Sequence, residues 1–320
     1  GLVFKNKDGR IHRTPPRKYI KDLDTIPFPS RDLLPPLDIY RPAAAYYKRT
    51  PVTHMFTSRG CPCQCIFCET PFGKVVRYHS PDYVVGEIEH LIKDFGVREV
   101  MINDDTFTVN KDRVYKICEL IRKQNLDIIW TCNIRVNTVD KPLLKAMKGA
   151  GCWLIMPGLE SGSQKILDAL KKGTTLEQAR NAIAWAHEVG LMTMPSFIIG
   201  NPLDTEDTIE ETIRFAKSLK TYYPKFTIMI PYPGTPLWNI AEKYGRIDRN
   251  GDFSKFILAS SEPPFVPHGL TKDVLIQKQR EAFRRLYWDP AMIWRHLTSI
   301  NSLEDIKRLW KGVATILSLQ

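Results

Sequence analysis

The chain of 320 residues is 43% hydrophobic and 25% charged, a composition ordinary for a globular protein with a sizeable core. It contains no apolar run near the roughly 18 residues that a membrane span needs, and its first residues have no signal-peptide character, so we expect a cytoplasmic protein. The net charge of +11 gathers at the ends, because residues 1–50 hold 11 Lys and Arg against 5 Asp and residues 271–320 hold 9 against 5 acidic residues. Basic ends fit a solvated surface or a peripheral contact with a membrane or another acidic partner. No basic motif with interleaved aromatic residues is present, so no nucleic-acid partner is expected.

Three regions follow one another along the chain. Residues 1–50 include a proline-rich stretch from residue 14 without helical or alternating period, which predicts an extended linker. Residues 51–238 alternate between apolar strand candidates and amphipathic helix candidates, and residues 239–320 read as a mainly helical extension. The strands are expected at 52–58, 98–103, 127–134, 152–157, 191–199 and 225–230. The helices are expected at 80–95, 110–124, 138–149, 163–189 and 204–219, the first two capped by Ser80 and Asn110.

Six strands that alternate with helices indicate an α/β fold with parallel strand pairing. We therefore predict a partial, six-stranded parallel β/α barrel with an extended N-terminal linker and a mainly helical C-terminal extension. Functional residues of such barrels lie at the carboxyl ends of the strands. Each candidate motif of the sequence falls at one of these ends.

The loop after the first strand, "TSRGCPCQCIFC", carries Cys61, Cys65 and Cys68 with the spacing Cys-x3-Cys-x2-Cys, and an additional Cys63. Three thiolates can hold three irons of a four-iron cluster and leave the fourth iron open to a small molecule. A zinc site explains the same cysteines, and Cys63 adds a fourth thiolate that could compete for metal. A disulfide framework is not expected in a chain of this length without a secretory signal. The remaining cysteines, 118, 132 and 152, sit singly in apolar segments and should pack as small hydrophobic residues.

This loop, with aromatic Phe67 just before its last cysteine, resembles the cluster motif of the radical S-adenosylmethionine (radical SAM) superfamily, and the later strand ends match in order. The resemblance implies cysteine ligands for a 4Fe-4S cluster and a set of contacts to SAM. "NDDTF" places Asp104 or Asp105 at the SAM ammonium, and "NIRVN" places Arg135 at the carboxylate. "PGLESGS" supplies Glu160 and Ser161, and "SFIIGNP" supplies Ile199 and Gly200 beside the adenine.

Further stretches narrow the resemblance. "PFPSRDLLP" (27–35), "DDTF" and "PYPGTPLW" (231–238) are similar to the branch whose members carry a cobalamin-binding domain before the barrel. The chain begins where the linker would stand, so any cobalamin would come with a separate domain. An external one-electron reductant of the flavodoxin or ferredoxin type is also implied.

The resemblance implies that the reduced cluster cleaves SAM to a 5′-deoxyadenosyl radical, which abstracts hydrogen from a small-molecule or lipid-like, large and apolar substrate. Cobalamin-dependent methyl transfer would follow. The alternatives are rearrangement, cyclisation or carbon–carbon bond formation without cobalamin, a methylthiotransferase, and a non-catalytic iron–sulfur protein of electron transfer. In the extension, the helices that carry Trp288, Trp294 and Trp310 are expected either to pack against the barrel or to form a membrane-surface face or substrate lid.

Overall fold

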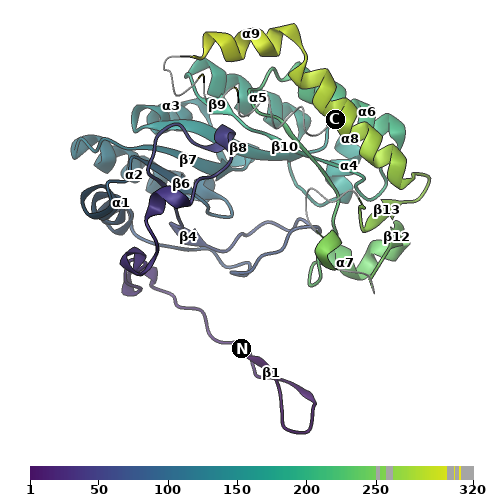
Figure 1. Ribbon diagram of the computed structural model, residues 1–320, viewed down its shortest axis with the longest axis horizontal. Helices are drawn as coiled ribbons and strands as arrows, with labels where there is room; N and C mark the ends of the chain where they lie inside the picture. The colour runs from purple at the N-terminus through teal and green to yellow at the C-terminus, as the bar shows by residue number, and fades with distance from the viewer. Residues whose placement is uncertain (250–252, 257–261, 301–305, 307–309, 311–320) are drawn as a thin grey trace.

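The computed structural model describes residues 1–249, 253–256, 262–300, 306 and 310, and it confirms the predicted partial barrel (Figure 1). Six parallel strands lie in the sheet order β11-β10-β8-β7-β6-β3, and the short β9 pairs with β8. The strands are β3 (Val52–Met55), β6 (Glu99–Ile102), β7 (Ile129–Ile134), β8 (Cys152–Glu160), β9 (Met192–Thr193), β10 (Ser196–Ile199) and β11 (Lys225–Ile228). Because β3 and β11 are the two ends of the sheet, the barrel is open on one side. The helix expected within 302–317 lies outside the described residues except for positions 306 and 310.

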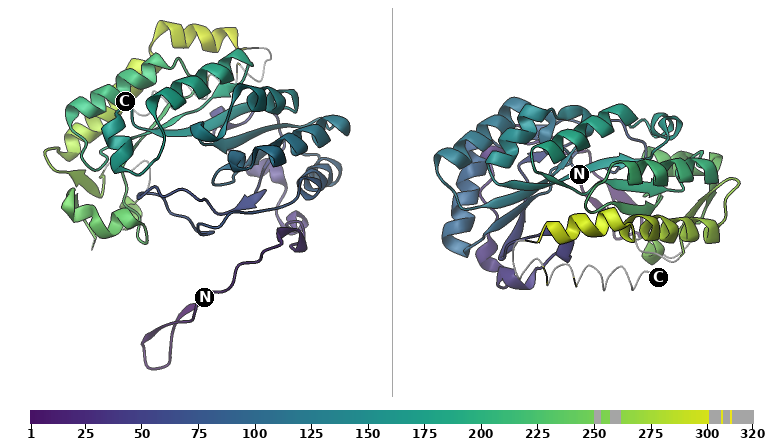
Figure 2. Two further views of the ribbon diagram at one scale, coloured as in Figure 1. Left: turned by 180° about the vertical axis from the view of Figure 1, so that it is seen from behind. Right: turned by 90° about the horizontal axis from the view of Figure 1, so that it is seen from above.

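Helices on the outer side of the sheet hold it in this curved form (Figure 2). They are α1 (Pro81–Phe95), α2 (Lys111–Lys123), α3 (Lys141–Gly149), α4 (Gln164–Ala169), α5 (Leu176–Glu188) and α6 (Glu206–Ser218). Apolar side chains of the helices and of the outward strand positions, such as Val84, Ile117, Trp130 and Leu144, form one buried core. Side-chain caps at Ser80 and Asn110 start α1 and α2 as the sequence predicts.

Two predicted elements are divided. The helix expected over 163–189 breaks into α4 and α5, because Lys171 and Gly173 adopt left-handed backbone angles, with φ of 51° and 63°. The strand expected over 191–199 breaks into β9 and β10 around Pro195, which has no N–H group for a strand ladder. Both breaks bring short loops to the carboxyl side of β8 and to the edge of the sheet.

The N-terminal segment is more ordered than an extended linker. A hairpin of β1 (Val3–Lys5) and β2 (Ile11–Arg13) projects from the body (Figure 1). Residues 19–31 then run along α1, where Leu23 is fully buried and Arg31 forms a buried ion pair with Glu87 at 2.8 Å. The residues just before β3 close the bottom of the barrel through the carboxylate of Glu99, which accepts hydrogen bonds from the backbone of Lys48 and Arg49.

The C-terminal extension contains both helices and a hairpin. Its elements are α7 (Pro236–Ile240), β12 (Gly245–Ile247), β13 (Phe265–Pro267), α8 (Lys272–Tyr287) and α9 (Pro290–Thr298). One face of α8 packs on the barrel through Leu275, Ala282 and Leu286. Trp288 and Trp294 are instead 49% and 68% exposed, and Trp310 is 72% exposed. These tryptophan side chains therefore do not take part in core packing, and no helix in the described part of the chain has the length and apolar character to cross a membrane.

Candidate metal centre and cofactor site

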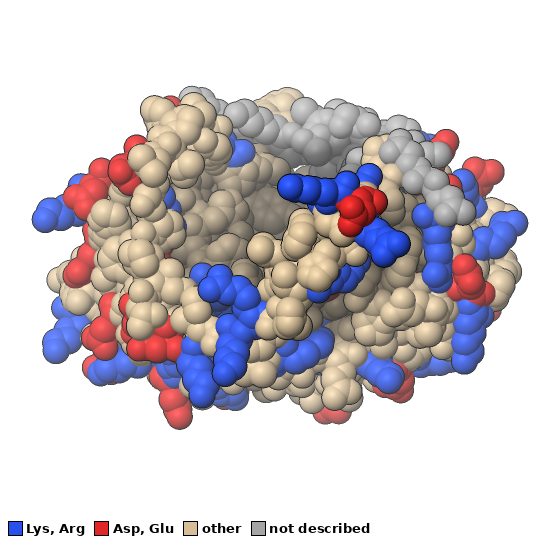
Figure 3. Space-filling model, turned by 90° about the horizontal axis from the view of Figure 1, so that it is seen from below, with Lys and Arg blue, Asp and Glu red and all other residues tan. Residues whose placement is uncertain are grey.

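The carboxyl ends of the strands surround a hollow with largely uncharged walls and with Lys and Arg side chains at its rim (Figure 3). The cysteine loop enters this region directly after β3. Its two ends are joined by a short antiparallel ladder between β4 (Ser58–Arg59) and β5 (Arg77–Tyr78). Gly60, with φ of 95°, allows a close approach, since a Cβ at this position would lie 2.4 Å from the carbonyl oxygen of Val75. The loop is thus closed at its base and presents its cysteines at the strand ends.

Asp104, at the end of β6, holds the base of this loop. Its fully buried carboxylate accepts four hydrogen bonds, from the backbone N–H and hydroxyl of Thr57, both at 2.6 Å, and from those of Ser58 at 3.1 and 2.6 Å. Arg113 of α2 supports the same turn by donating to the carbonyl of Thr57 at 2.7 Å. The carboxylate of Asp104 is therefore committed to the protein itself.

Asp105, the next residue, has a different environment. Its side chain is exposed and lies near Cys61, and its carboxylate accepts a hydrogen bond from the backbone N–H of Gly60. Partial burial, followed by the neighbouring Cys61 and Asp104, raises the pKa of Asp105 above its ordinary value. Of the two carboxylates predicted for the SAM ammonium, Asp105 is the one that is available at the surface of the site.

The cysteine thiols face different neighbours. The Cys61 sulfur lies 3.9 Å from the hydroxyl of Thr106, and a hydrogen bond with the Cys63 thiol lowers the pKa of Cys61. Cys65 is buried against Arg135, whose Nη1 lies 3.6 Å from the sulfur. Cys68 stands at the exposed face of the loop, but the protein atoms packed around its sulfur, followed by the neighbouring Cys65 and Cys61, raise its pKa to about 11.

Within the described ranges, no three Cys, His, Asp or Glu side chains are grouped around the position of a single ion. An iron–sulfur cluster does not require this, because each of its thiolates binds a different iron. The donor set therefore fits a four-iron cluster: soft thiolates stand on one loop, close enough to influence one another's pKa, and the Arg135 guanidinium lies beside them.

The structure adds Lys172, which the sequence did not single out. Its ammonium forms an ion pair with Glu160 at 2.8 Å, and both side chains are 9% exposed. Lys172 also lies 6.0 Å from the centre of the Phe67 ring and acts electrostatically on Cys68. Glu160, which has a left-handed φ of 66°, is therefore brought together with the cysteine loop through this lysine. "LKKGTT" looks like an ordinary exposed helix end, and only the fold reveals the burial.

The remaining predicted residues occupy packed positions. Ser161 is fully buried and its hydroxyl lies 3.0 Å from that of Thr212 on α6. The Ile199 side chain is fully buried in the core. Gly200 has φ of 79°, and a Cβ there would lie 3.1 Å from Leu275 of α8. Because Gly200 has no side chain, it can contact a ligand only through its backbone groups.

The three cysteines outside the loop pack in the core as predicted. Cys118, Cys132 and Cys152 are at most 2% exposed. Burial raises the pKa of Cys118 to about 12 and that of Cys132 well above its ordinary value. The thiols of Cys118 and Cys132 therefore stay protonated, and all three cysteines belong to the core and not to the site.

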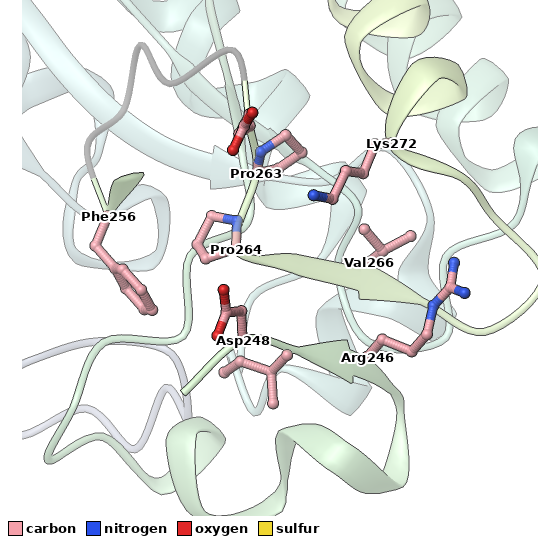
Figure 4. Close-up of a pocket in the computed structure, with 9 residues that line it drawn as sticks. Arg246, Asp248, Phe256, Pro263, Pro264, Val266 and Lys272 are labelled. Carbon is pink, nitrogen blue, oxygen red and sulfur yellow. The ribbon is translucent and has the colours of Figure 1, made fainter. Parts of the chain in front are cut away.

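A separate cavity of about 280 Å³ lies beside the β12–β13 hairpin (Figure 4). Its lining includes Arg246, Asp248 and Lys272. No lining residue belongs to the cysteine loop or to the strand ends described above, so this cavity is not part of the candidate site.

Comparison with known proteins agrees with the fold. The family model of the Radical SAM superfamily matches residues 55–216, about half of the chain. The chain therefore belongs to the radical SAM superfamily of enzymes.

Curated relatives extend this likeness. An uncharacterized methyltransferase of Pyrococcus horikoshii is 43% identical over 75% of this chain and 51% of its own length. The anaerobic magnesium-protoporphyrin IX monomethyl ester cyclase of Rubrivivax gelatinosus is 29% identical over 92% of this chain and 52% of its own. The chain spans about half the length of these relatives.

Solved structures show the same fold. The cobalamin-dependent S-adenosylmethionine radical enzyme OxsB, with aqua-cobalamin and S-adenosylmethionine bound, aligns with a TM-score of 0.70 and 17% identity over 98% of this chain and 50% of that chain. The radical S-adenosylmethionine methyltransferase TsrM from Kitasatospora setae aligns with a TM-score of 0.60 and 19% identity, over 75% and 52% of the two chains.

Proposed function

We propose that this chain is the catalytic part of a radical SAM enzyme that binds a 4Fe-4S cluster through Cys61, Cys65 and Cys68. The observation that carries the proposal is the closed cysteine loop at the end of β3, held by Asp104 and facing Arg135. When bound, the reduced cluster supplies one electron to SAM, whose cleavage yields the 5′-deoxyadenosyl radical that abstracts hydrogen from the substrate. The protein contributes binding, orientation and the exclusion of water.

The charged residues of the site would hold the amino-acid part of SAM. The buried Arg135 would pair with the carboxylate, since a guanidinium binds a carboxylate with two parallel hydrogen bonds. The exposed carboxylate of Asp105 would accept from the ammonium, because Asp104 is already fully bonded. Glu160 would accept a hydrogen bond from a SAM hydroxyl or from the ammonium once its ion pair with Lys172 opens. The Lys172 ammonium would then be free to pair with the SAM carboxylate.

The adenosyl part of SAM would lie toward the β8 and β10 side of the sheet. Gly200 offers backbone groups at the end of β10, while Ile199 and Ser161 shape the site from their buried positions. Phe67 and Ile66 belong to a cluster that includes Phe265, and this cluster would shield the loop from water. Cys68 is exposed, so an external flavodoxin- or ferredoxin-type reductant would approach the loop from its side.

The substrate is proposed to be large and apolar. Trp153, Met156 and Met194 form a buried apolar cluster, with Tyr46 packed against it, and the hollow has largely uncharged walls (Figure 3). Methionine side chains adapt to irregular apolar surfaces, which suits such a substrate. Residues 51–238 would carry the chemistry and residues 239–320 would cover the substrate. The similarity to methyltransferases and to cobalamin-dependent enzymes supports cobalamin-dependent methyl transfer with the cobalamin on a separate domain, and the similarity to a cyclase keeps ring formation as the second candidate.

Anaerobic reconstitution with iron and sulfide tests this proposal. The reduced protein should show a four-iron electron paramagnetic resonance signal that shifts on addition of SAM, with 5′-deoxyadenosine as product. A cluster signal that does not change when SAM is added would instead support an electron-transfer protein. A protein that contains zinc and no cluster would contradict the assignment of a 4Fe-4S site. Formation of S-adenosylhomocysteine only when cobalamin is added would separate methyl transfer from ring formation.

A further inference from the structure

The strap, which we define as residues 19–31, contacts the part of the cysteine loop that follows its last cysteine. We call this part, residues 72–77, the loop arm. The Tyr19 ring lies on Gly73, where a Cβ would stand 2.0 Å from the tyrosine oxygen. The guanidinium of Arg77 lies over the ring, 4.2 Å from its centre. Arg77 also donates to the carbonyl of Phe72 at 2.8 Å and to that of Ile20 at 3.4 Å. Tyr19 is thus held between two residues of the loop, although half of its surface is exposed.

This arm of the loop is in direct contact with the first cysteine. The backbone N–H of Cys61 donates to the carbonyl of Gly73 at 3.1 Å. Gly60 approaches the same arm so closely that a Cβ there would lie 3.0 Å from the Gly73 oxygen. A continuous series of contacts therefore leads from Tyr19 through Gly73 to Cys61.

A second set of contacts fixes the strap at the base of the loop. The Asp24 carboxylate accepts from the backbone N–H of Ser80 at 2.9 Å and lies 3.3 Å from Nδ1 of His79. The backbone N–H of His79 donates to the carbonyl of Thr57, whose own N–H and hydroxyl are bound by Asp104. Together with the buried Arg31–Glu87 pair, these contacts keep the rest of the strap in place when Tyr19 alone is changed.

We propose that the strap belongs to the cluster site, with Tyr19 as a positioning residue that keeps the loop arm, and through it Cys61, in the cluster-binding arrangement. The inference rests on the proposed function, because it requires that the loop hold a cluster. Tyr19 contacts no candidate ligand of iron or SAM, so its effect is on how long the cluster stays bound. The loop would open more often without the ring, and iron would escape during these openings.

The test measures the rate at which the reconstituted protein loses iron to a coloured ferrous chelator under anaerobic conditions. Tyr19→Ala should accelerate iron loss roughly two- to fivefold, the effect of losing one exposed cation–π contact. Tyr19→Phe keeps the ring on Gly73 and under Arg77, so it should release iron at the wild-type rate. Tyr40→Ala is the matched control, because Tyr40 has a similar exposure, 47%, and lies outside the strap in the same N-terminal region.

Thermal unfolding of the same reconstituted variants, followed by circular dichroism, separates positioning from general stability. The proposal expects that Tyr19→Ala loses iron faster than the wild type. Its unfolding temperature should equal that of Tyr40→Ala, and its four-iron signal before the chelator is added should equal that of the wild type. Iron loss at the wild-type rate in Tyr19→Ala, or equal acceleration in Tyr40→Ala, overturns the role of the strap while the proposed function stands. A wild-type protein that takes up no cluster overturns both.

Discussion

Replacing Asp104 tests whether this residue holds the loop or binds a ligand. In Asp104→Ala, two buried backbone N–H groups, those of Thr57 and Ser58, lose their acceptor. Each unsatisfied buried group costs about 1–3 kcal/mol, so we expect the free energy of unfolding to fall by about 2–6 kcal/mol. This is a large part of the 5–15 kcal/mol typical of a folded domain. The two hydroxyls can turn to other acceptors and are not counted, and the buried Arg113 also loses a nearby negative charge.

The isosteric Asp104→Asn should cost only about 1–2 kcal/mol, because its amide oxygen can still accept both N–H groups; the charge assistance is lost, and the two hydroxyls must turn to accept from the amide nitrogen that replaces Oδ2. Urea unfolding followed by tryptophan fluorescence measures both changes. Asp105→Asn is the matched control: it should leave the unfolding free energy within about 0.5 kcal/mol of wild type, as for other surface substitutions. It should weaken the SAM-induced shift of the cluster signal. Wild-type stability in Asp104→Ala, or an equal loss in Asp105→Asn, would refute this reasoning.

Three further predictions concern the same barrel. Cys63→Ala should keep iron content and SAM cleavage near wild type, whereas Cys61→Ala should abolish both, and equal losses would contradict the three-ligand site. Lys172→Met should destabilise the protein by about 3–5 kcal/mol, since it leaves the buried Glu160 charge unpaired. In urea unfolding, the double variant Lys172→Met with Glu160→Gln should have an unfolding free energy closer to that of the wild type. If the second substitution restores no stability, the buried ion pair between Lys172 and Glu160 is contradicted.

The third prediction concerns Asp204. Burial raises the pKa of this carboxyl from 3.8 to about 6. The folded chain binds this proton more tightly than the unfolded chain, so the contribution to stability is complete below about pH 4 and is lost as the pH rises through 6. Relative to Asp204→Asn, the wild type should lose about 2.5 kcal/mol between pH 4 and pH 7 in urea unfolding; a difference independent of pH would show that the carboxyl is not protonated in the folded chain.

The candidate site was only partly readable from the chain. The cysteine spacing and the positions of Arg135, Glu160 and Gly200 after successive strands could be predicted, because the carboxyl ends of parallel strands meet at one edge. The choice between Asp104 and Asp105 could not be made. Neighbouring residues at a strand end point to opposite sides, and the position of Thr57 and Ser58 decides which carboxylate becomes fully bonded.

The sequence by itself determined the half-barrel and its cysteine loop, because hydrophobic periodicity and ligand spacing are local properties of the chain. Only the tertiary structure decided that Lys172 is a buried partner of Glu160, that Ile199 belongs to the core, and that Tyr19 rests on Gly73. Lysine side chains are exposed in most folded chains, and the surroundings of all three residues depend on segments that lie far away in sequence. Tyr19 and Gly73 are separated by more than fifty positions, and only the folded path of the strap along α1 brings them into contact.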